Sequence, residues 1–110
     1  MSQKTYNITD NVNDDFQFIV RDKKYSMRYP RTEEIEQLQE LTNELKDAEP
    51  LQKSDPEAYK EKVRGVEDYM YEFISPIEHE TPIREALEKE NVVVMRNFNT
   101  MIKTELSLEQ

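Results

Sequence analysis

Apolar and polar residues alternate in two short segments near the start of the chain. The first runs from residue 16 to residue 20 and the second from residue 25 to residue 29, with a short polar turn between them. Two runs of period 2 around such a turn predict a β-hairpin over residues 16–29. Because an isolated hairpin is only marginally stable in water, we expect its apolar face to pack on helices. That face would carry Phe16, Phe18, Val20, Tyr25, Met27 and Tyr29.

After Pro30 the spacing of the apolar residues changes to three and four, which is the period of an amphipathic helix. Thr32 is the expected N-cap of the first helix, and Ser54 with Glu57 forms a capping-box pattern before the second. The second helix is expected to end near Pro76. The pattern predicts four helices, over approximate ranges of residues 32–48, 55–74, 82–90 and 92–107.

These elements define an α+β fold that is mainly α, in which an N-terminal β-hairpin precedes three to four packed helices. The 110 residues suit a flexible N-terminal segment over residues 1–14 and a single compact domain over residues 15–110. Within the N-terminal segment Tyr6 and Ile8 alternate with polar residues, so a short strand is an alternative there. Only 35% of the residues are apolar, so each helix is expected to bury one stripe or to leave surface for a partner.

The chain is strongly acidic, with a net charge of −9. Phosphate backbones bind clustered basic residues, so we expect no contact with nucleic acid, and the same charge disfavours an anionic membrane surface. No apolar run could span a bilayer, and the first residues lack the apolar stretch of a signal peptide. The absence of cysteine fits a reducing compartment. We therefore expect a cytoplasmic protein that favours a basic protein partner.

No combination of residues indicates catalysis, a metal site or a cofactor. A Ser-His-Asp triad or a zinc site would need His79, the single histidine, which lies in a loop-like stretch and which we interpret as a solvated loop residue. A phosphate-binding loop would need several glycines, and the chain has only Gly65. We predict that the protein is not an enzyme and that it uses no cofactor.

Acidic residues line one face of the first predicted helix at spacings of three and four. The segment 32–50 carries seven acids and one lysine, whereas the segment 17–31 has a net charge of +4. The row could lie under the basic hairpin, or it could simply be solvated. It could also dock a basic partner, and Glu36, Glu40 and Glu44 are its candidate binding residues. The full acidic row is Glu33, Glu36, Glu40, Glu44 and Asp47.

The last predicted helix is apolar around most of its circumference. Successive residues turn by about 100°, so the run from Val92 to Met95 covers most directions around the axis. Such a helix is either central in the core or covered by a partner. We expect one of Met95 and Met101 to be buried and the other to lie at the surface. The candidate partner-binding residues here are Val92, Val93, Met95, Phe98, Met101 and Ile102.

Two stretches resemble the small tail assembly chaperones of siphophages and of prophages in Gram-positive bacteria. One is the hairpin-to-helix passage from Phe16 to Leu38. The other joins Leu87-Glu-Lys-Glu-Asn91 to Met95-Arg-Asn-Phe98 and to Ile102-Lys-Thr-Glu-Leu106. The resemblance covers residues 16–106 and consists of hydrophobic patterns. It implies a non-enzymatic assembly factor, because members of that family coat the long helical tape measure protein and help recruit tail tube subunits. Some are also made in a longer, frameshifted form.

Two further interpretations concern the partner. An acidic protein of this size could mimic DNA and inhibit, or serve as an adaptor for, a basic host protein. That role needs carboxylates spaced like phosphates on an exposed face, and the 15 Lys and Arg residues weaken it. The apolar last helix could also contact a second copy of the chain, which would make the protein a homo-oligomer.

Overall fold

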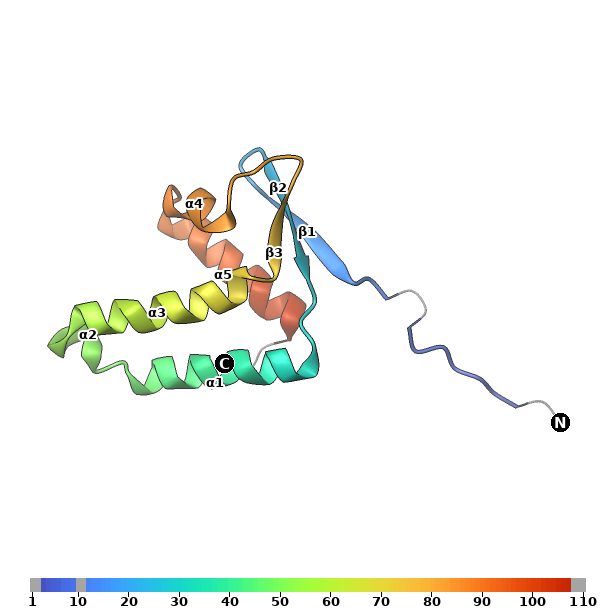
Figure 1. Ribbon diagram of the computed structural model, residues 1–110, viewed down its shortest axis with the longest axis horizontal. Coiled ribbons are helices and arrows are strands. Elements are labelled where there is room, and N and C mark those ends of the chain that lie inside the picture. Colours follow the sequence, from blue (N-terminus) through green and yellow to red (C-terminus); the bar gives the residue numbers. More distant parts are fainter. Residues whose placement is uncertain (1–2, 10–11, 108–110) are drawn as a thin grey trace.

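The computed structural model describes residues 3–9 and 12–107, which form a small antiparallel sheet and five helices (Figure 1). The fold is therefore α+β and mainly α, as the periodicity predicts. Three short stretches lie outside the described residues. Two of them, residues 1–2 and 10–11, belong to the predicted N-terminal segment, and the third, residues 108–110, ends the predicted domain. The elements are β1 (Asp15–Val20), β2 (Lys23–Arg28), α1 (Thr32–Asp47), α2 (Leu51–Ser54), α3 (Pro56–Tyr71), β3 (Ile74–Ile77), α4 (Ile83–Glu88) and α5 (Val92–Leu106).

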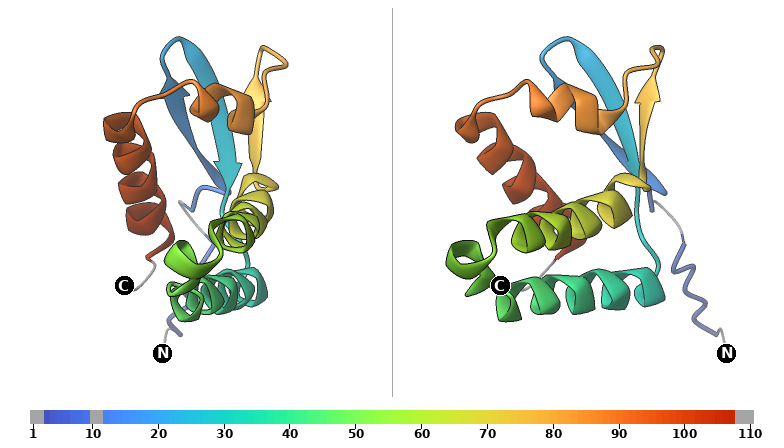
Figure 2. Two further views of the ribbon diagram at one scale, coloured as in Figure 1. Left: turned by 90° about the vertical axis from the view of Figure 1, so that its left-hand side faces the viewer. Right: turned by 60° about the vertical axis from the view of Figure 1, so that its left-hand side comes forward.

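The predicted hairpin is present and forms two of the three strands, in the order β1-β2-β3. Phe16 pairs with Met27 and Phe18 pairs with Tyr25, so the side chains of these residues share one face. That face is covered by helices (Figure 2). Tyr25 and Met27, on the central strand, are 0% exposed, because neighbouring strands flank them on both sides.

The strand β3 corrects the prediction that the second long helix continues to residue 74. The helix α3 ends at Tyr71, and the Phe73 carbonyl accepts the Arg28 N–H at 3.0 Å. From Ile74 onward the chain pairs with β2. Pro76 cannot continue a helix, but an edge strand tolerates it because the missing N–H can face away from the ladder. The predicted end of this helix therefore lay too late in the sequence, because a short strand that contains proline resembles the end of a helix.

Helix starts also differ from the predicted caps. Arg31 is the N-cap of α1 in place of Thr32, because the Glu34 carboxylate accepts the Arg31 N–H at 2.8 Å. Asp55 is the N-cap of α3 in place of Ser54, and its carboxylate accepts the Ala58 N–H at 3.3 Å. Ser54 instead ends α2, a single turn that the periodicity did not predict because it is too short to show a period.

The core lies between the sheet and the helices. Its buried residues come from β1 and β2, from the β3 region and from α1, α4 and α5. The two long helices α1 and α3 lie side by side as a helical hairpin connected by α2 (Figures 1 and 2). This helical hairpin packs on the core mainly through partly buried side chains, because Leu38 is the one buried residue of α1 and α3 has none among the described residues.

Candidate protein-binding site

A groove with a volume of about 500 Å³ lies between α1, α3 and α5. Its floor is apolar and its rim is polar. The rim combines amide and ammonium groups from α1 and α5, chiefly Gln39, Asn43, Lys46, Asn99 and Lys103. The floor consists of Leu38, Leu45, Val63, Val66, Met70 and Ile102.

The groove exists because the apolar stripes of α1 and α3 are not fully covered. Leu45, Val63, Val66 and Met70 are each half-buried, although they occupy the inward positions that their spacing predicts. The helix α5 lies to one side of the helical hairpin (Figure 2), and only its C-terminal half borders the groove. Half-buried side chains along a groove are typical of surfaces that accept an apolar partner. The residues of α3 were not among the predicted site residues; the sparse apolar composition of the chain was the signal that could have indicated them.

The acidic row lies on the solvent side of α1 and is exposed, and none of its residues lines the groove. Glu36 and Glu40 precede the rim residues Gln39 and Asn43 by three positions, which makes each acid a surface neighbour of the rim. The basic hairpin does not cover the row. Its Arg28 pairs with α1 only through Glu34, which is not a member of the row, at 2.7 Å. The carboxylates of the row therefore remain available to a basic partner.

The candidate residues of α5 are divided between the core and the surface. Phe98 and Ile102 are only 5% and 3% exposed, so two of the six predicted contact residues belong to the core. Met95 and Met101 are both half-buried, so the expectation that one is buried and the other exposed is wrong. The reason is that both residues lie on the flanks of the buried stripe, where they pack against the core at one side only.

Val92 and Val93 are exposed, at 71% and 51%, and they lie at the end of α5 beside α4 (Figure 2). This end is held firmly. The Asn91 side chain accepts the N–H groups of Val93 and Val94 at 2.9 and 3.0 Å, which caps the helix. The two valines therefore form a small, well-supported apolar patch. Because the acidic row lies on α1, at the other end of α5, this patch and the row do not form one continuous surface.

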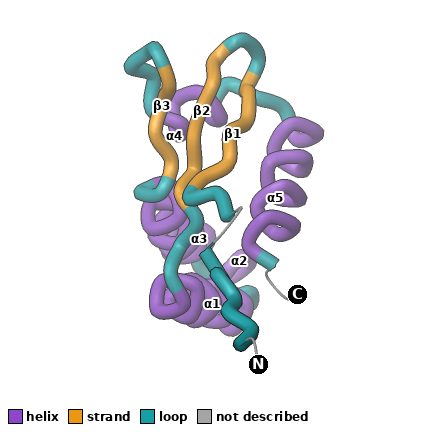
Figure 3. The backbone as a smooth tube through the Cα atoms, turned by 90° about the vertical axis from the view of Figure 1, so that its right-hand side faces the viewer, coloured by secondary structure: helices purple, strands orange, loops and turns teal. Residues whose placement is uncertain are grey.

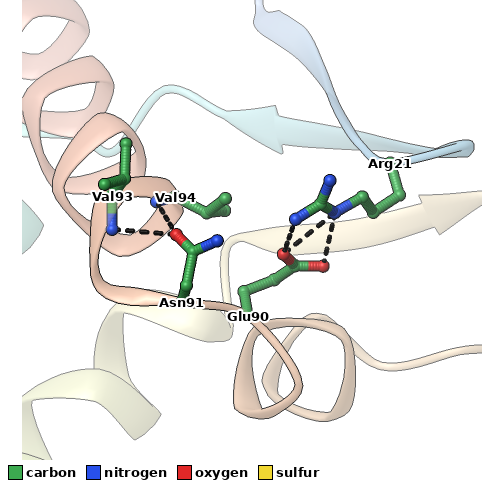
Figure 4. A network of polar contacts seen from close by, with 5 residues as sticks. All are labelled: Arg21, Glu90, Asn91, Val93 and Val94. Atoms are coloured by element: carbon green, nitrogen blue, oxygen red, sulfur yellow. Dashed lines mark hydrogen bonds and ion pairs between the residues drawn. The ribbon is translucent and has the colours of Figure 1, made fainter.

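An ion pair joins this end of α5 to the hairpin turn (Figure 4). The Arg21 guanidinium contacts the Glu90 carboxylate at 2.7 Å, and the hydrogen bond lowers the pKa of Glu90. Arg21 has a φ angle of 61°, in the left-handed region that favours glycine. The bidentate contact with Glu90 therefore holds a turn whose backbone conformation is otherwise costly.

Arg84 joins α4 to α3 at the far wall of the groove. Its guanidinium contacts Glu67 at 3.1 Å and also pairs with Asp68, and it lies 5.0 Å from the centre of the Tyr71 ring. Burial raises the pKa of Tyr71 to about 12, so its hydroxyl stays protonated. Glu67 lines the groove, but its carboxylate already has a partner, so this carboxylate does not add a free negative charge to the rim.

His79 is a structural residue, which corrects its interpretation as a solvated loop residue. Its Nδ1 accepts the Thr81 N–H at 3.1 Å, which leaves Nε2 to donate to the Lys24 carbonyl at 2.9 Å. The ring also packs edge-on against Tyr25, with 4.9 Å between the ring centres. Both ring nitrogens are therefore used to hold the loop after β3 against β2. The loop-like spacing was correct, but the packing of the ring depends on the third strand.

We expect Glu34 to titrate with a pKa of about 2, against an ordinary value of 4.5, because Arg28 and the Arg31 N–H bind its carboxylate. Since the folded-state pKa is the lower one, this contact stabilises the fold above pH 4.5, and its contribution is lost as the pH falls towards 2. An NMR titration of the carboxyl carbons measures the pKa directly.

The control for this titration is a pair of substitutions on α1. Glu34→Gln should remove this part of the acid dependence of the free energy of unfolding. Glu36→Gln, which removes an exposed carboxylate of the row, should leave the contribution of Glu34 in place. Titration of Glu34 near 4.5 would show that the Arg28 contact does not persist in solution.

The described residues contain no group of three or more His, Asp and Glu side chains placed to hold a metal ion. They also contain no buried polar or charged side chain of the kind that active sites use. None of the described helices combines the length and the apolar character that crossing a membrane requires. Comparisons of the chain with family models, with curated proteins and with solved structures find no match. The groove and the acidic row are thus the features on which a function can be based.

Proposed function

We propose that this protein is a non-enzymatic binding protein that takes an amphipathic helix of a partner protein into the groove between α1, α3 and α5. One observation carries the proposal: among the described residues, Leu38 is the one fully buried side chain of α1 and α3, and the two helices leave a half-covered apolar floor. An amphipathic helix inserts apolar side chains at spacings of three and four, which matches a groove bounded by helices.

Charge narrows the class of partner. The acidic row lies on α1 beside the rim residues Gln39 and Asn43 of the groove, and the whole chain carries −9. A partner helix with basic residues beside its apolar face would therefore be attracted, and an acidic one repelled. The resemblance to tail assembly chaperones supports the same class of partner, because the tape measure protein is a long helical chain. We propose this role in tail assembly as the cellular context of the groove.

The test uses two synthetic amphipathic helices as probes. One carries leucine on one face and lysine on the other, and the second has glutamate in place of lysine. We expect the Leu/Lys helix to shift the NMR methyl signals of Leu45, Val63 and Val66 in a saturable way, and the Leu/Glu helix to bind much more weakly.

Val63→Lys, in the floor of the groove, should abolish binding of the Leu/Lys helix. The matched control Val92→Lys, on the exposed end of α5, should preserve it. Shifts centred on Val92 and Val93 would contradict the groove as the binding site. Binding of polylysine through the row, without any shift in the floor, would instead favour the acidic inhibitor or adaptor.

A further inference from the structure

The strand β1 has one edge that no described residue pairs with. The Tyr29 N–H donates to the Asp14 carbonyl at 2.9 Å, which sets the phase of the ladder between β1 and β2. Hydrogen-bonded and non-bonded pairs alternate in an antiparallel ladder. The backbone groups of Asp15, Gln17 and Ile19 must therefore point away from β2. No described group hydrogen-bonds to them.

The side chains of β1 show the same incomplete packing. Phe16 and Phe18 lie on the helix-covered face but stay half-buried, whereas their partners on β2 are fully buried. The sequence of β1 contains neither the lysine nor the proline that usually protects a free strand edge, and its one charged residue is Asp15, at its first position. A fourth strand at this edge would cover both phenylalanines and satisfy the free backbone groups.

The helix α5 would form a floor for such a strand. It lies on the helix-covered side and extends past the β1 edge of the sheet (Figures 2 and 3). Asn99 and Lys103 face the groove, and at 100° per residue Val94 and Met101 lie on the opposite flank of the helix. Both residues are half-buried, so an added strand could complete their packing.

The N-terminal arm (residues 3–9) has the properties of this strand. Tyr6 and Ile8 are 76% and 87% exposed and alternate with polar residues. The arm extends away from the folded part of its own chain (Figure 1). Its single charged residue is Lys4, so it brings no like charge to Asp15.

We propose that the N-terminal arm of one copy adds to the β1 edge of a second copy as a fourth, antiparallel strand. With Tyr6 opposite Phe18 and Ile8 opposite Phe16, the apolar residues of the arm lie over α5 and Asn7 faces Gln17. The local hydrogen bond from the Thr9 N–H to Asn7, at 3.1 Å, gives way to the ladder. In the structure the arm extends away from its own β1 (Figure 1), so the occupant of the edge is the arm of a second copy. The proposal is independent of the groove.

Cross-linking tests the proposal, because the natural chain contains no cysteine. Residues opposite each other in an antiparallel pair have Cα atoms about 5.5 Å apart, within the range of a disulfide. Under mild oxidation, a mixture of the Asn7→Cys and Gln17→Cys proteins should give a covalent dimer on non-reducing electrophoresis. The control mixture pairs Asn7→Cys with Glu57→Cys, which places a thiol at an exposed side chain on α3, and should give none. Equal yields in the two mixtures would overturn the proposal.

Two further variants separate a second copy from the protein's own arm. In dilute solution the double variant Asn7→Cys/Gln17→Cys should form disulfides between chains, and a disulfide within one chain would overturn the proposal. Asn7→Pro removes an N–H that the ladder needs and should abolish the dimer measured by sedimentation, while Asn7→Ala should retain it. The melting temperature of the monomer should not change, because the arm lies apart from the folded domain.

Discussion

Replacing Phe98 by alanine is expected to lower the free energy of unfolding by about 3–5 kcal/mol. Phe98 is buried, and its ring centre lies 5.8 Å from that of Phe18 and 6.2 Å from that of Tyr71. The side chain therefore joins α5 to both the sheet and the end of α3, and its removal leaves a cavity that three elements cannot easily close. Since a domain of this size has a stability of about 5–15 kcal/mol, the variant should lose a large part of it. Urea denaturation followed by circular dichroism measures the change.

The control is Val93→Ala on the same helix. Val93 is half-exposed, so its truncation should change the free energy of unfolding by no more than about 0.5 kcal/mol. The two variants distinguish the core residues of α5 from its surface residues. Similar costs for both would show that α5 packs differently from the arrangement in Figure 2.

The parts of the fold that could be predicted are those with a long periodic pattern. The hairpin and the helices α1, α3 and α5 each show a repeated spacing over several residues. The strand β3 is four residues long and contains proline, so its pairing depends on β2 and not on a pattern of its own. The same dependence explains His79, which has a structural role only because β3 brings its loop against Lys24.

The sequence predicts individual parts of the candidate site but not the arrangement of helices that forms the groove. The acidic row followed from helical spacing, and its exposure agrees with the interpretation of a solvated face. Ile102 was selected from the apolar circumference of its helix, and it does line the groove, although as a buried floor residue. The contribution of Val63, Val66 and Met70 depends on how far α5 covers the helical hairpin. The packing angle between α5 and the helical hairpin decides this coverage, and the apolar stripe of one helix does not determine that angle.

Leu38 is the most deeply buried contact between the helical hairpin and the core among the described residues, whereas the other hairpin residues packed on the core are only partly buried. This residue is 2% exposed and is the buried residue of α1, while α3 contributes none from the described part of the chain. Segments with few buried apolar contacts open at a lower free energy than the rest of a domain. The amides of α1 and α3 should therefore exchange with solvent faster than those of β2, and a partner in the groove should slow them.

Leu38→Ala is accordingly expected to lower the free energy of unfolding by about 2–5 kcal/mol and to speed amide exchange mainly in α1 and α3. Leu45→Ala is the matched control, because Leu45 lies on the same stripe but is half-exposed in the groove. Leu45→Ala should lower the free energy of unfolding by less than half as much, because less of the Leu45 side chain is buried. It should nevertheless weaken binding of the Leu/Lys helix more than any variant of an exposed α5 residue does. Hydrogen exchange measured by mass spectrometry, with and without the probe helix, separates the two effects. Equal acceleration of exchange in the sheet by Leu38→Ala would contradict this expectation. It would show that the helical hairpin and the sheet unfold as one cooperative unit. The groove would then be a fixed surface that binding of a partner does not order further.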